Sequence, residues 1–236
     1  MSLIDATRDA FGLLFSGDPV LWKIIWVSLK TSLVGLLVAT PVAVLIGYLI
    51  ATREFVGRRI AIWIAQATLS LPTVLVGLLL YLMLSRQGPM GSMQWLFTQA
   101  GIIFGQVLIV LPVLIAFTLS AVQAADPRLA ETAVVHGASP WRVMLTVLHE
   151  VRFGVMAAVI NGFGRVISEV GCAMMVGGNI AGETRTITTA IALETSKGEF
   201  AQGIALGIVL IAIALLINAA MLLLQGDTRP ARNRGV

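Results

Sequence analysis

Residues that could do chemistry are few in this sequence, and they gather in three places. The first is the stretch 131–150, which holds two His, two Glu and an Arg in an otherwise strongly apolar chain. The second is the pair Arg165 and Glu169, and the third is the run of hydroxyl side chains at 184–189. None of these places joins a nucleophile to a base and an orienting group, so no enzyme site is predicted. The two His have no third ligand close by in sequence, so no metal site is predicted either.

Arg165 and Glu169 stand four residues apart inside an apolar stretch. On one helix that spacing puts them on the same face, where they can pair. A single charge at the centre of a bilayer costs about 2.5–3.5 kcal/mol on insertion scales, so both side chains should face water or the protein interior. Two interpretations stay open. Either Arg165 attracts an anion along a pathway while Glu169 tempers that attraction, or the two form an ion pair that fixes helix packing.

The run at 184–189 offers hydrogen-bond donors near an expected helix start. Backbone and side-chain donors at a helix N-terminus suit an oxyanion, and the following helix is predicted to end at Lys197 and Gly198. The candidate contacts are Thr184, Arg185, Thr186, Thr188 and Thr189. The alternative is a solvated amphipathic helix in a loop.

The stretch 131–150 and its upstream flank contain two sets of helix signals. Asp126 is a candidate N-cap with Pro127 at the first helical position, and Gly137 is expected to end that helix. Ser139 and Pro140 then begin a second helix, so the sequence predicts a short helical hairpin with a tight turn. Apolar side chains available for contact with another protein are Val134, Val135, Trp141, Met144 and Leu145.

The composition determines the setting of these residues. Of the 236 residues, 58% are hydrophobic and 12% are charged, whereas roughly 25% are charged in soluble domains. The mean hydropathy is +0.93, which predicts an all-α integral membrane protein. The net charge of +4 is explained by basic residues that flank membrane spans, so no nucleic acid partner is predicted. The single cysteine, Cys172, excludes a disulfide within the chain.

About five membrane spans are predicted within one domain, 1–236. A span needs about 20 mostly apolar residues, and five stretches qualify: 24–51, 60–84, 101–124, 153–178 and 203–225. Pro41, Pro72 and Pro112 are expected to kink the spans that contain them. The remaining parts are an interfacial N-terminal segment at 1–23, a cytoplasmic loop at 125–152 and a cytoplasmic tail at 226–236.

The basic residues give the orientation. Five spans place the two ends of the chain on opposite sides, and the side with the loop 125–152 then carries more Lys and Arg. That side holds Arg53, Arg58, Arg59, Arg128, Arg142, Arg152, Arg229, Arg232 and Arg234, against Arg8, Lys23, Lys30, Arg86, Arg185 and Lys197 on the other. The positive-inside rule therefore predicts the N-terminus outside and the C-terminus inside.

In the loop 125–152, Glu131, Thr132 and Ala133 are followed by Gly137, six residues after the Glu, and then by Ala138 and Ser139. This pattern resembles the "EAA" loop of ABC importer permeases. The end of the loop, His-Glu-Val-Arg-Phe-Gly at 149–154, resembles the S-E-A-R-F-G ending of the tungstate-type permeases. Two later stretches resemble the same subgroup, GRVISEVGCAMMVGGNI at 164–180 and TRTITTAIALETSKGEF at 184–200.

This resemblance implies a fold, a function and partners. It implies a type I ABC importer-like permease in the cell (inner) membrane, which dimerises and imports an oxyanion. Tungstate is favoured, with molybdate and sulfate as alternatives. The loop, with Trp141 among its contacts, would dock on a cytoplasmic ATP-binding subunit, two copies per complex, and an extracytoplasmic substrate-binding protein would deliver the anion.

No cofactor is expected in this chain, because it contains no G-x-x-x-x-G-K-[ST] phosphate loop. ATP and Mg would be used by the ATPase subunit. Two other classes of function stay open. One is a secondary transporter or channel, in which Arg165 and Glu169 would be coupling or gating charges. The other is a membrane scaffold that recruits a cytoplasmic protein and transports nothing.

Overall fold

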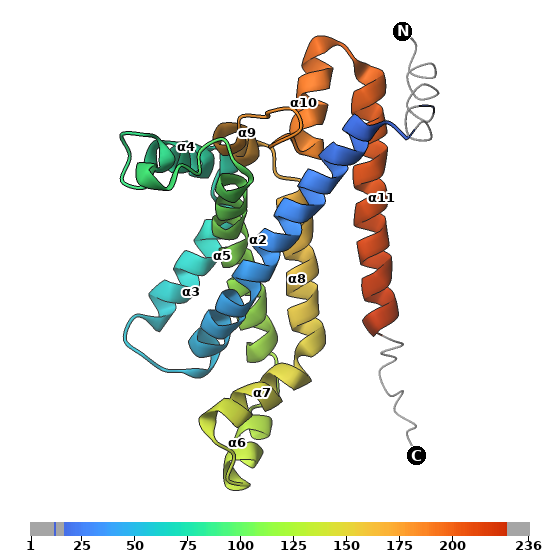
Figure 1. Cartoon of the computed structure of the whole chain (residues 1–236). Coiled ribbons are helices and arrows are strands. Elements are labelled where there is room, and N and C mark those ends of the chain that lie inside the picture. Colours follow the sequence, from blue (N-terminus) through green and yellow to red (C-terminus); the bar gives the residue numbers. More distant parts are fainter. Residues whose placement is uncertain (1–11, 13–16, 226–236) are drawn as a thin grey trace.

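The computed structural model describes residue 12 and residues 17–225, and every regular element in these ranges is a helix. Figure 1 shows the arrangement. In chain order the elements are α2 (Pro19–Thr52), α3 (Arg58–Ala67), η1 (Thr68–Ser70), α4 (Thr73–Leu84), η2 (Gly91–Met93), α5 (Gln99–Gln123), α6 (Pro127–Val135), α7 (Pro140–Glu150), α8 (Arg152–Ile167), α9 (Gly171–Gly177), α10 (Ile187–Lys197) and α11 (Phe200–Gln225). The predicted tail 226–236 and most of the predicted interfacial segment 1–23 lie outside the described residues.

Among the described residues, three helices are long and apolar enough to cross a membrane, and the number rises to five if each of two bent pairs forms one span. The long helices α2, α5 and α11 confirm the predicted spans 24–51, 101–124 and 203–225. The first begins earlier than expected, at Pro19, where the Asp18 side chain accepts a hydrogen bond from the Val20 amide. Pro41 and Pro112 both lie inside their helices.

The predicted span 60–84 is not one helix. It is divided into α3 with η1 and then α4, which are bent by 98° relative to each other. The break lies at Leu71 and Pro72, and Leu71 is extended, with φ −65° and ψ 132°. A proline disfavours helical geometry in the residue before it, and here it ends the helix rather than kinking it.

The predicted span 153–178 is also wrong as a continuous helix. α8 ends at Ile167, and the separate short helix α9 begins at Gly171. At the other end, α8 follows α7 with a bend of 72°. The Glu169 side chain accepts a hydrogen bond from the Cys172 amide, so this residue bonds to the first turn of α9, whereas the prediction placed it on the same helix as Arg165.

The core lies between α2, α5 and α8, with residues such as Ala39, Leu114 and Ala158 fully buried. A second cluster joins α4, α5 and α9 around Cys172. Close approach of these helices depends on two glycines. A Cβ on Gly77 would lie 2.7 Å from the Cys172 Cα atom, and one on Gly105 would lie 2.6 Å from the Cys172 sulfur.

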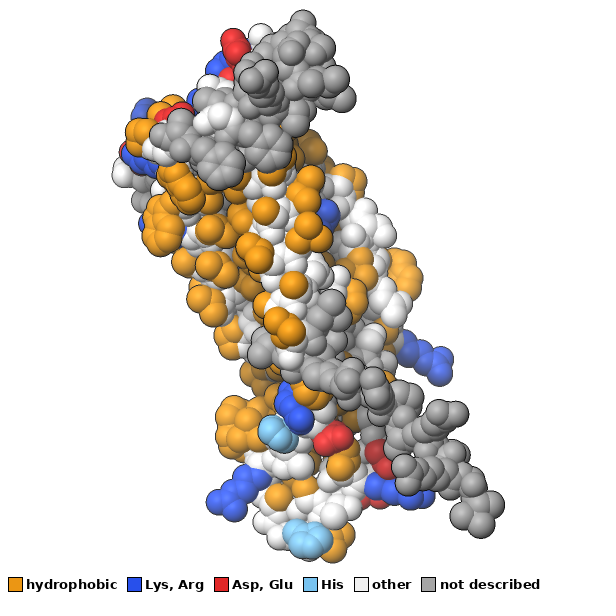
Figure 2. All heavy atoms as spheres, turned by 90° about the vertical axis from the view of Figure 1, so that its right-hand side faces the viewer, with side chains coloured by type: hydrophobic (Ala, Val, Ile, Leu, Met, Phe, Trp, Pro, Cys, Tyr) orange, Lys and Arg blue, Asp and Glu red, His pale blue; other side chains and the backbone are white. Residues whose placement is uncertain are grey.

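The connections gather at two ends of the helical bundle. Figure 1 shows the α6–α7 hairpin, the α2–α3 connection and the last turns of α11 at one end, and η2, α9 and the start of α10 at the other. This grouping of the connections is the one that the predicted spans require. Figure 2 shows hydrophobic side chains along the middle of one face, with charged side chains and His mainly toward its ends. Ile211, Leu215 and Leu216 of α11 are each more than 60% exposed, as expected for a surface that faces lipid.

Candidate transport pathway and coupling hairpin

The hairpin at 125–152 has the predicted helix ends. The Asp126 carboxylate accepts a hydrogen bond of 2.9 Å from the Arg128 amide, and Pro127 is the first residue of α6. Gly137 has φ +75°, with no atom within 4 Å of the position that a Cβ would take. This left-handed conformation is easy for glycine and costly for other residues. It makes the turn, and α7 begins at Pro140 as predicted.

Large apolar side chains at the hairpin point away from the protein. Val134 is 61% exposed, Val135 83% and Trp141 63%. Met144, which the sequence placed in the same exposed group, is instead only 7% exposed. It packs with Val147 against Tyr48 and Val122, and thereby seats α7 on the ends of α2 and α5. The exposed apolar surface therefore covers the tip of the hairpin and extends along α7 to Leu145, which is 48% exposed.

The other residues predicted for coupling are also accessible. Glu131 and Ser139 are exposed. Thr132, Ala133 and Ala138 line a groove of about 770 Å³ between α6 and α7, together with charged side chains that include Arg128 and Arg142. The hairpin thus presents apolar residues beside a charged groove. Its role in coupling stays a prediction.

One face of α8 is polar and exposed. Asn161, Gly164, Arg165 and Ser168 recur at helical spacing and are all exposed. The Asn161 side chain donates to the Ala157 carbonyl and the Ser168 hydroxyl donates to the Gly164 carbonyl. Each of these two side chains is therefore hydrogen-bonded to the backbone of α8. No hydrogen bond or ion pair occupies the Arg165 guanidinium within the part of the chain that is described. Arg165 is therefore the charge that this face offers.

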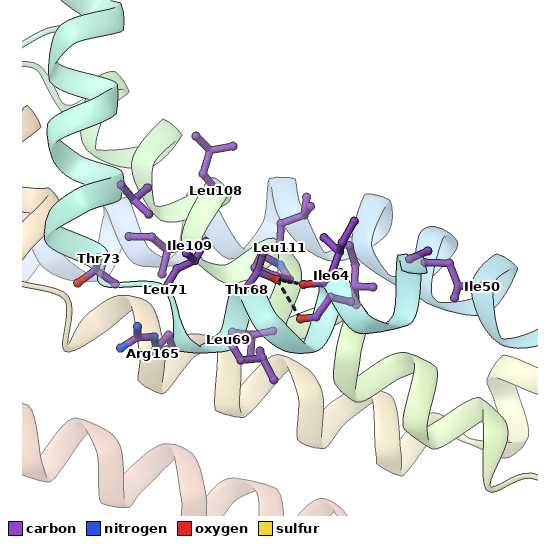
Figure 3. A pocket seen from close by; sticks show the side chains of 16 residues that line it. Ile50, Ile64, Thr68, Leu69, Leu71, Thr73, Leu108, Ile109, Leu111 and Arg165 are labelled. Atoms are coloured by element: carbon purple, nitrogen blue, oxygen red, sulfur yellow. Dashed lines mark hydrogen bonds between the residues drawn. The ribbon is translucent and has the colours of Figure 1, made fainter. Parts of the chain in front are cut away.

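Arg165 lines a cavity of about 420 Å³ between α3, η1, α4 and α5. Figure 3 shows its side chain below Leu71 and near Thr73, at the break between η1 and α4. Arg165 is the one charged residue among those that line the cavity, and the walls are mainly aliphatic, with Ile64, Leu69 and others. The positive charge of Arg165 thus favours an anion at one point of an otherwise apolar cavity wall.

The predicted pair of Arg165 and Glu169 is not formed. No ion pair joins these two side chains, and Glu169 is 5% exposed whereas Arg165 is exposed. The prediction assumed one helix through both residues, but α8 ends at Ile167. Glu169 consequently turns inward to the first turn of α9, where its carboxylate accepts the Cys172 amide at 3.0 Å. The interpretation as a packing ion pair is therefore wrong.

The threonines at 184–189 are buried, and their hydroxyls bond within the chain. Thr184 donates to the Gly177 carbonyl, and Thr188 donates to the Glu169 carbonyl at 2.7 Å. Thr186 and Thr189 form a reciprocal capping box at the start of α10. The predicted helix end is confirmed, because α10 stops at Lys197 and is followed by Gly198 with φ +83°.

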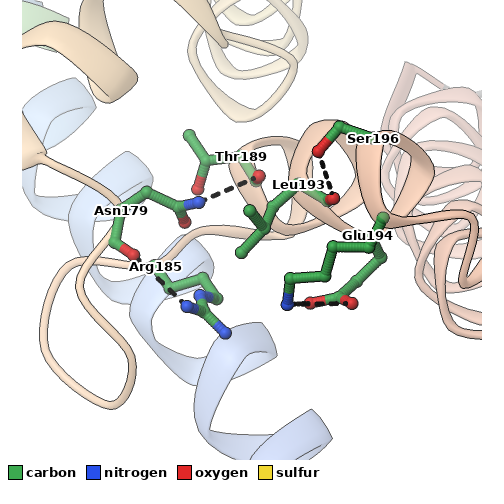
Figure 4. Close-up of polar contacts among 7 residues, drawn as sticks. Asn179, Arg185, Thr189, Leu193, Glu194 and Ser196 are labelled. Atoms are coloured by element: carbon green, nitrogen blue, oxygen red, sulfur yellow. Dashed lines mark hydrogen bonds and ion pairs between the residues drawn. The ribbon is translucent and has the colours of Figure 1, made fainter.

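Arg185 lies beside these threonines but is only partly buried. Figure 4 shows one of its terminal nitrogens directed at the Asn179 carbonyl, at 3.4 Å. Its Nε has no hydrogen-bond partner among the described residues. Asn179 in turn donates to the Thr189 carbonyl. Arg185 is therefore the member of the predicted group with hydrogen-bonding capacity to spare.

Comparisons with known proteins decide the family. Residues 43–230 match the family described as the inner membrane component of binding-protein-dependent transport systems. The chain belongs to this family. The permease is 39% identical to the tungstate uptake system permease protein TupB of Campylobacter jejuni, over 92% of this chain and 90% of that protein. It is 37% identical to a probable anion ABC transporter permease of Haloferax volcanii, over 88% and 91% of the two chains.

The fold of the permease is shared with a solved structure. A bacterial alginate ABC transporter in complex with a substrate-bound periplasmic protein aligns over 89% of this chain and 80% of that chain, with a TM-score of 0.72 and 22% identity. The predicted resemblance to ABC importer permeases is confirmed, and the permease is a multi-pass membrane protein.

Two polar residues of the permease that connect its segments at the α10 end of the bundle were not predicted from the sequence. Ser28 of α2 accepts a hydrogen bond of 2.6 Å from the Ile187 amide at the start of α10. Gln99 of α5 accepts from Lys30 and donates to the Glu183 carbonyl. Ser28 and Ile187 stand 159 positions apart, and no local pattern marks such a contact.

Proposed function

We propose that this permease is the membrane subunit of an ATP-driven importer for an oxyanion, and that the oxyanion is tungstate. Two copies of the chain form the pathway, with the N-terminus outside and the C-terminus inside. Each copy docks on a cytoplasmic ATP-binding subunit, which uses ATP and Mg, while this chain carries no cofactor. An extracytoplasmic binding protein delivers the anion at the opposite end. The names of the tungstate and anion relatives support the substrate class.

The observation that carries this proposal is the exposed polar face of α8. A charged side chain at membrane depth is costly, yet Arg165 is exposed and no acidic side chain in the described ranges pairs with it. An anion that passes along this face would compensate the charge in transit. A second copy that presents the same face would enclose the path between two chains, which favours a homodimer.

The two ends of the permease have different parts in this proposal. At the inner end, the exposed Val135 and Trp141 of the hairpin suit an apolar groove on the ATPase subunit. Glu131, Thr132, Ala133, Gly137, Ala138 and Ser139 shape and orient that contact. At the outer end, Glu169 and the segment Thr184, Arg185, Thr186, Thr188 and Thr189 form the gate, in which Arg185 is the group that meets the anion.

Uptake by vesicles that contain the permease, its ATPase subunit and its binding protein tests the transport function. We expect ATP-dependent tungstate uptake, with molybdate and sulfate as weaker competitors. Arg165→Met should abolish most of the uptake in a complex that still assembles, and Arg165→Lys, which keeps the charge, should restore part of it. Normal uptake by Arg165→Met would remove Arg165 from the pathway. Uptake driven by an ion gradient without the ATPase would support a secondary transporter instead, and absence of all flux would support a scaffold.

Co-purification of the ATPase subunit tests the coupling hairpin. Glu131→Lys reverses an exposed charge on α6, and Gly137→Val places a β-branched residue at φ +75°, so both should weaken capture of the ATPase. Glu183→Lys makes the same charge reversal at an exposed position of the outer end and serves as the control. If both hairpin variants capture the ATPase as well as this control does, the hairpin is not the coupling element.

A further inference from the structure

The junction between α8 and α9 is tied to two other helices by buried hydrogen bonds. The Glu169 carbonyl accepts the Thr188 hydroxyl of α10 at 2.7 Å, while the Glu169 carboxylate accepts the Cys172 amide of α9. One residue away on α10, the Ile187 amide donates to Ser28 of α2. Glu169, Thr188 and Ser28 are each less than 7% exposed. Their bonds are thus shielded from water, and a lost partner here is not replaced by solvent.

A continuous path of backbone leads from this junction to the hairpin. α8 runs from Arg152 to Ile167, directly after α7, and the Val151 amide bonds to the Val147 carbonyl across the bend. A single helix of this length moves as one rigid element. A change in the orientation of α7 therefore displaces the far end of α8 at Ile167, and with it Glu169, which lies two residues beyond that end.

α10 has few other ties to this junction. It packs mainly on α11 and, through its first turn, on α2. Within the described part of the chain, the Thr188 bond is the hydrogen bond between α10 and residues 168–170. The start of α10 is formed by the capping box of Thr186 and Thr189, and the Thr188 hydroxyl adds one contact to it, 3.2 Å from the Thr186 hydroxyl. Loss of the Thr188 hydroxyl would therefore remove the tie and its contact with Thr186, while the reciprocal bonds between Thr186 and Thr189 that begin the helix remain.

We propose that the Thr188–Glu169 hydrogen bond is the mechanical link between the hairpin end and the outer gate. It rests on the proposed importer function. Thr188 is a positioning residue in this role, because its hydroxyl proton is committed to a buried carbonyl. Movement of α8 reaches the outer segment through this bond, and a signal from the outer end returns to the hairpin the same way, since energetic coupling between two sites is reciprocal.

The test uses the complete complex in vesicles and measures how strongly the tungstate-loaded binding protein stimulates ATP hydrolysis. The readout is the ratio of the hydrolysis rates with and without that protein. Thr188→Val keeps the shape but removes the donor, and we expect the ratio to fall about fivefold, as for one buried hydrogen bond. Thr188→Ser restores the donor and should return the ratio to within about twofold of the unmodified complex. A purely structural defect would lower the amount of assembled complex and would leave the ratio unchanged.

Thr40→Val is the matched control, because the Thr40 hydroxyl bonds only to the Leu36 carbonyl of its own helix. It should leave the ratio unchanged. If Thr188→Val fails to assemble, Thr188→Ala, which also removes the donor and is smaller, gives the same comparison. Normal stimulation in an assembled Thr188→Val or Thr188→Ala complex overturns the link. Absence of uptake and stimulation in the unmodified complex would instead overturn the importer function itself.

Discussion

The hairpin of α6 and α7 and the outer segment, residues 184–197 at the outer end in the proposed function, have similar sequence signals. Their side chains are nevertheless arranged in opposite ways. Both place a capping residue before a short helix, Asp126 before α6 and Thr186 before α10. In the hairpin the Asp126 cap bonds locally, and the large apolar side chains at the tip face outward, with Val135 83% exposed. In the outer segment the polar side chains face inward, and Thr188 and Thr189 bond to the chain itself.

This difference separates what each region can contribute. A surface that exposes apolar side chains gains free energy when another protein covers it. A segment whose polar groups are satisfied within the chain gains little from a ligand, and it contributes stability and geometry instead. Substitutions in the hairpin should therefore alter binding of the ATPase. Substitutions of the buried polar groups that hold the outer segment should leave that binding unchanged and alter the stability of the permease or, at Thr188, the stimulation of hydrolysis.

The largest effect is expected for Trp141→Ala. An aromatic anchor at the centre of an interface contributes about 2 kcal/mol or more, so the ATPase subunit should bind about 30-fold more weakly. The stability of the isolated permease should change by less than about 0.5 kcal/mol, because the side chain is 63% exposed. Binding is measured by titration of the ATPase onto permease in nanodiscs. Trp26→Ala removes a side chain of similar exposure, 66%, from α2, and equal losses in the two variants would contradict an interface at the hairpin.

A smaller effect, and of the opposite kind, is expected for Ser28→Ala. The Ile187 amide would lose its acceptor in a buried site, which costs about 1–3 kcal/mol of unfolding free energy. Thermal unfolding in detergent should show the loss, while ATPase binding stays unchanged. Ser196→Ala is the control, since that exposed hydroxyl bonds only to the nearby Leu193 carbonyl. A stable Ser28→Ala protein with weakened ATPase binding would reverse the assignment of the two regions.

The smallest effect should come from alanine at two glycines with positive φ. Gly137 in the hairpin has φ +75° and Gly198 after α10 has φ +83°, and both are open to solvent. Alanine at either position should cost about 1 kcal/mol of unfolding free energy through backbone strain alone. The comparison predicts that only Gly137→Ala also weakens capture of the ATPase. If both variants capture the ATPase equally well, binding of the ATPase tolerates a change in the relative orientation of α6 and α7.

Helix ends and tight turns were predictable from the sequence, because their causes lie within a few residues. Asp126 with Pro127, the turn at Gly137, and the end of α10 at Gly198 are all formed as expected. The three long spans follow from apolar length alone. Membership of the permease family was carried by the spacing between Glu131 and Gly137 together with the later stretches.

The predictions that proved wrong concern features that depend on contacts between distant segments of the chain. Apolar length marks a span but not a break within it, so the bend of 98° at Pro72 was read as a kink. The same error placed Arg165 and Glu169 on one helix face, although α8 ends between them at Ile167 and the separate helix α9 begins at Gly171. The threonine run was correctly placed at a helix start, but its internal bonds to Glu169 and Gly177 carbonyls require the folded positions of α8 and α9.

The position of Cys172 bears on how these movements can be observed. It is the single cysteine of the sequence, it is 2% exposed, and its sulfur lies against Gly105 with no room for an added Cβ. A thiol enclosed in this way reacts slowly with maleimides. A second cysteine placed on the exposed hairpin or on the outer loop would therefore take a fluorophore or spin label selectively, in the native sequence background, and without replacement of a residue that the packing of α4, α5 and α9 requires.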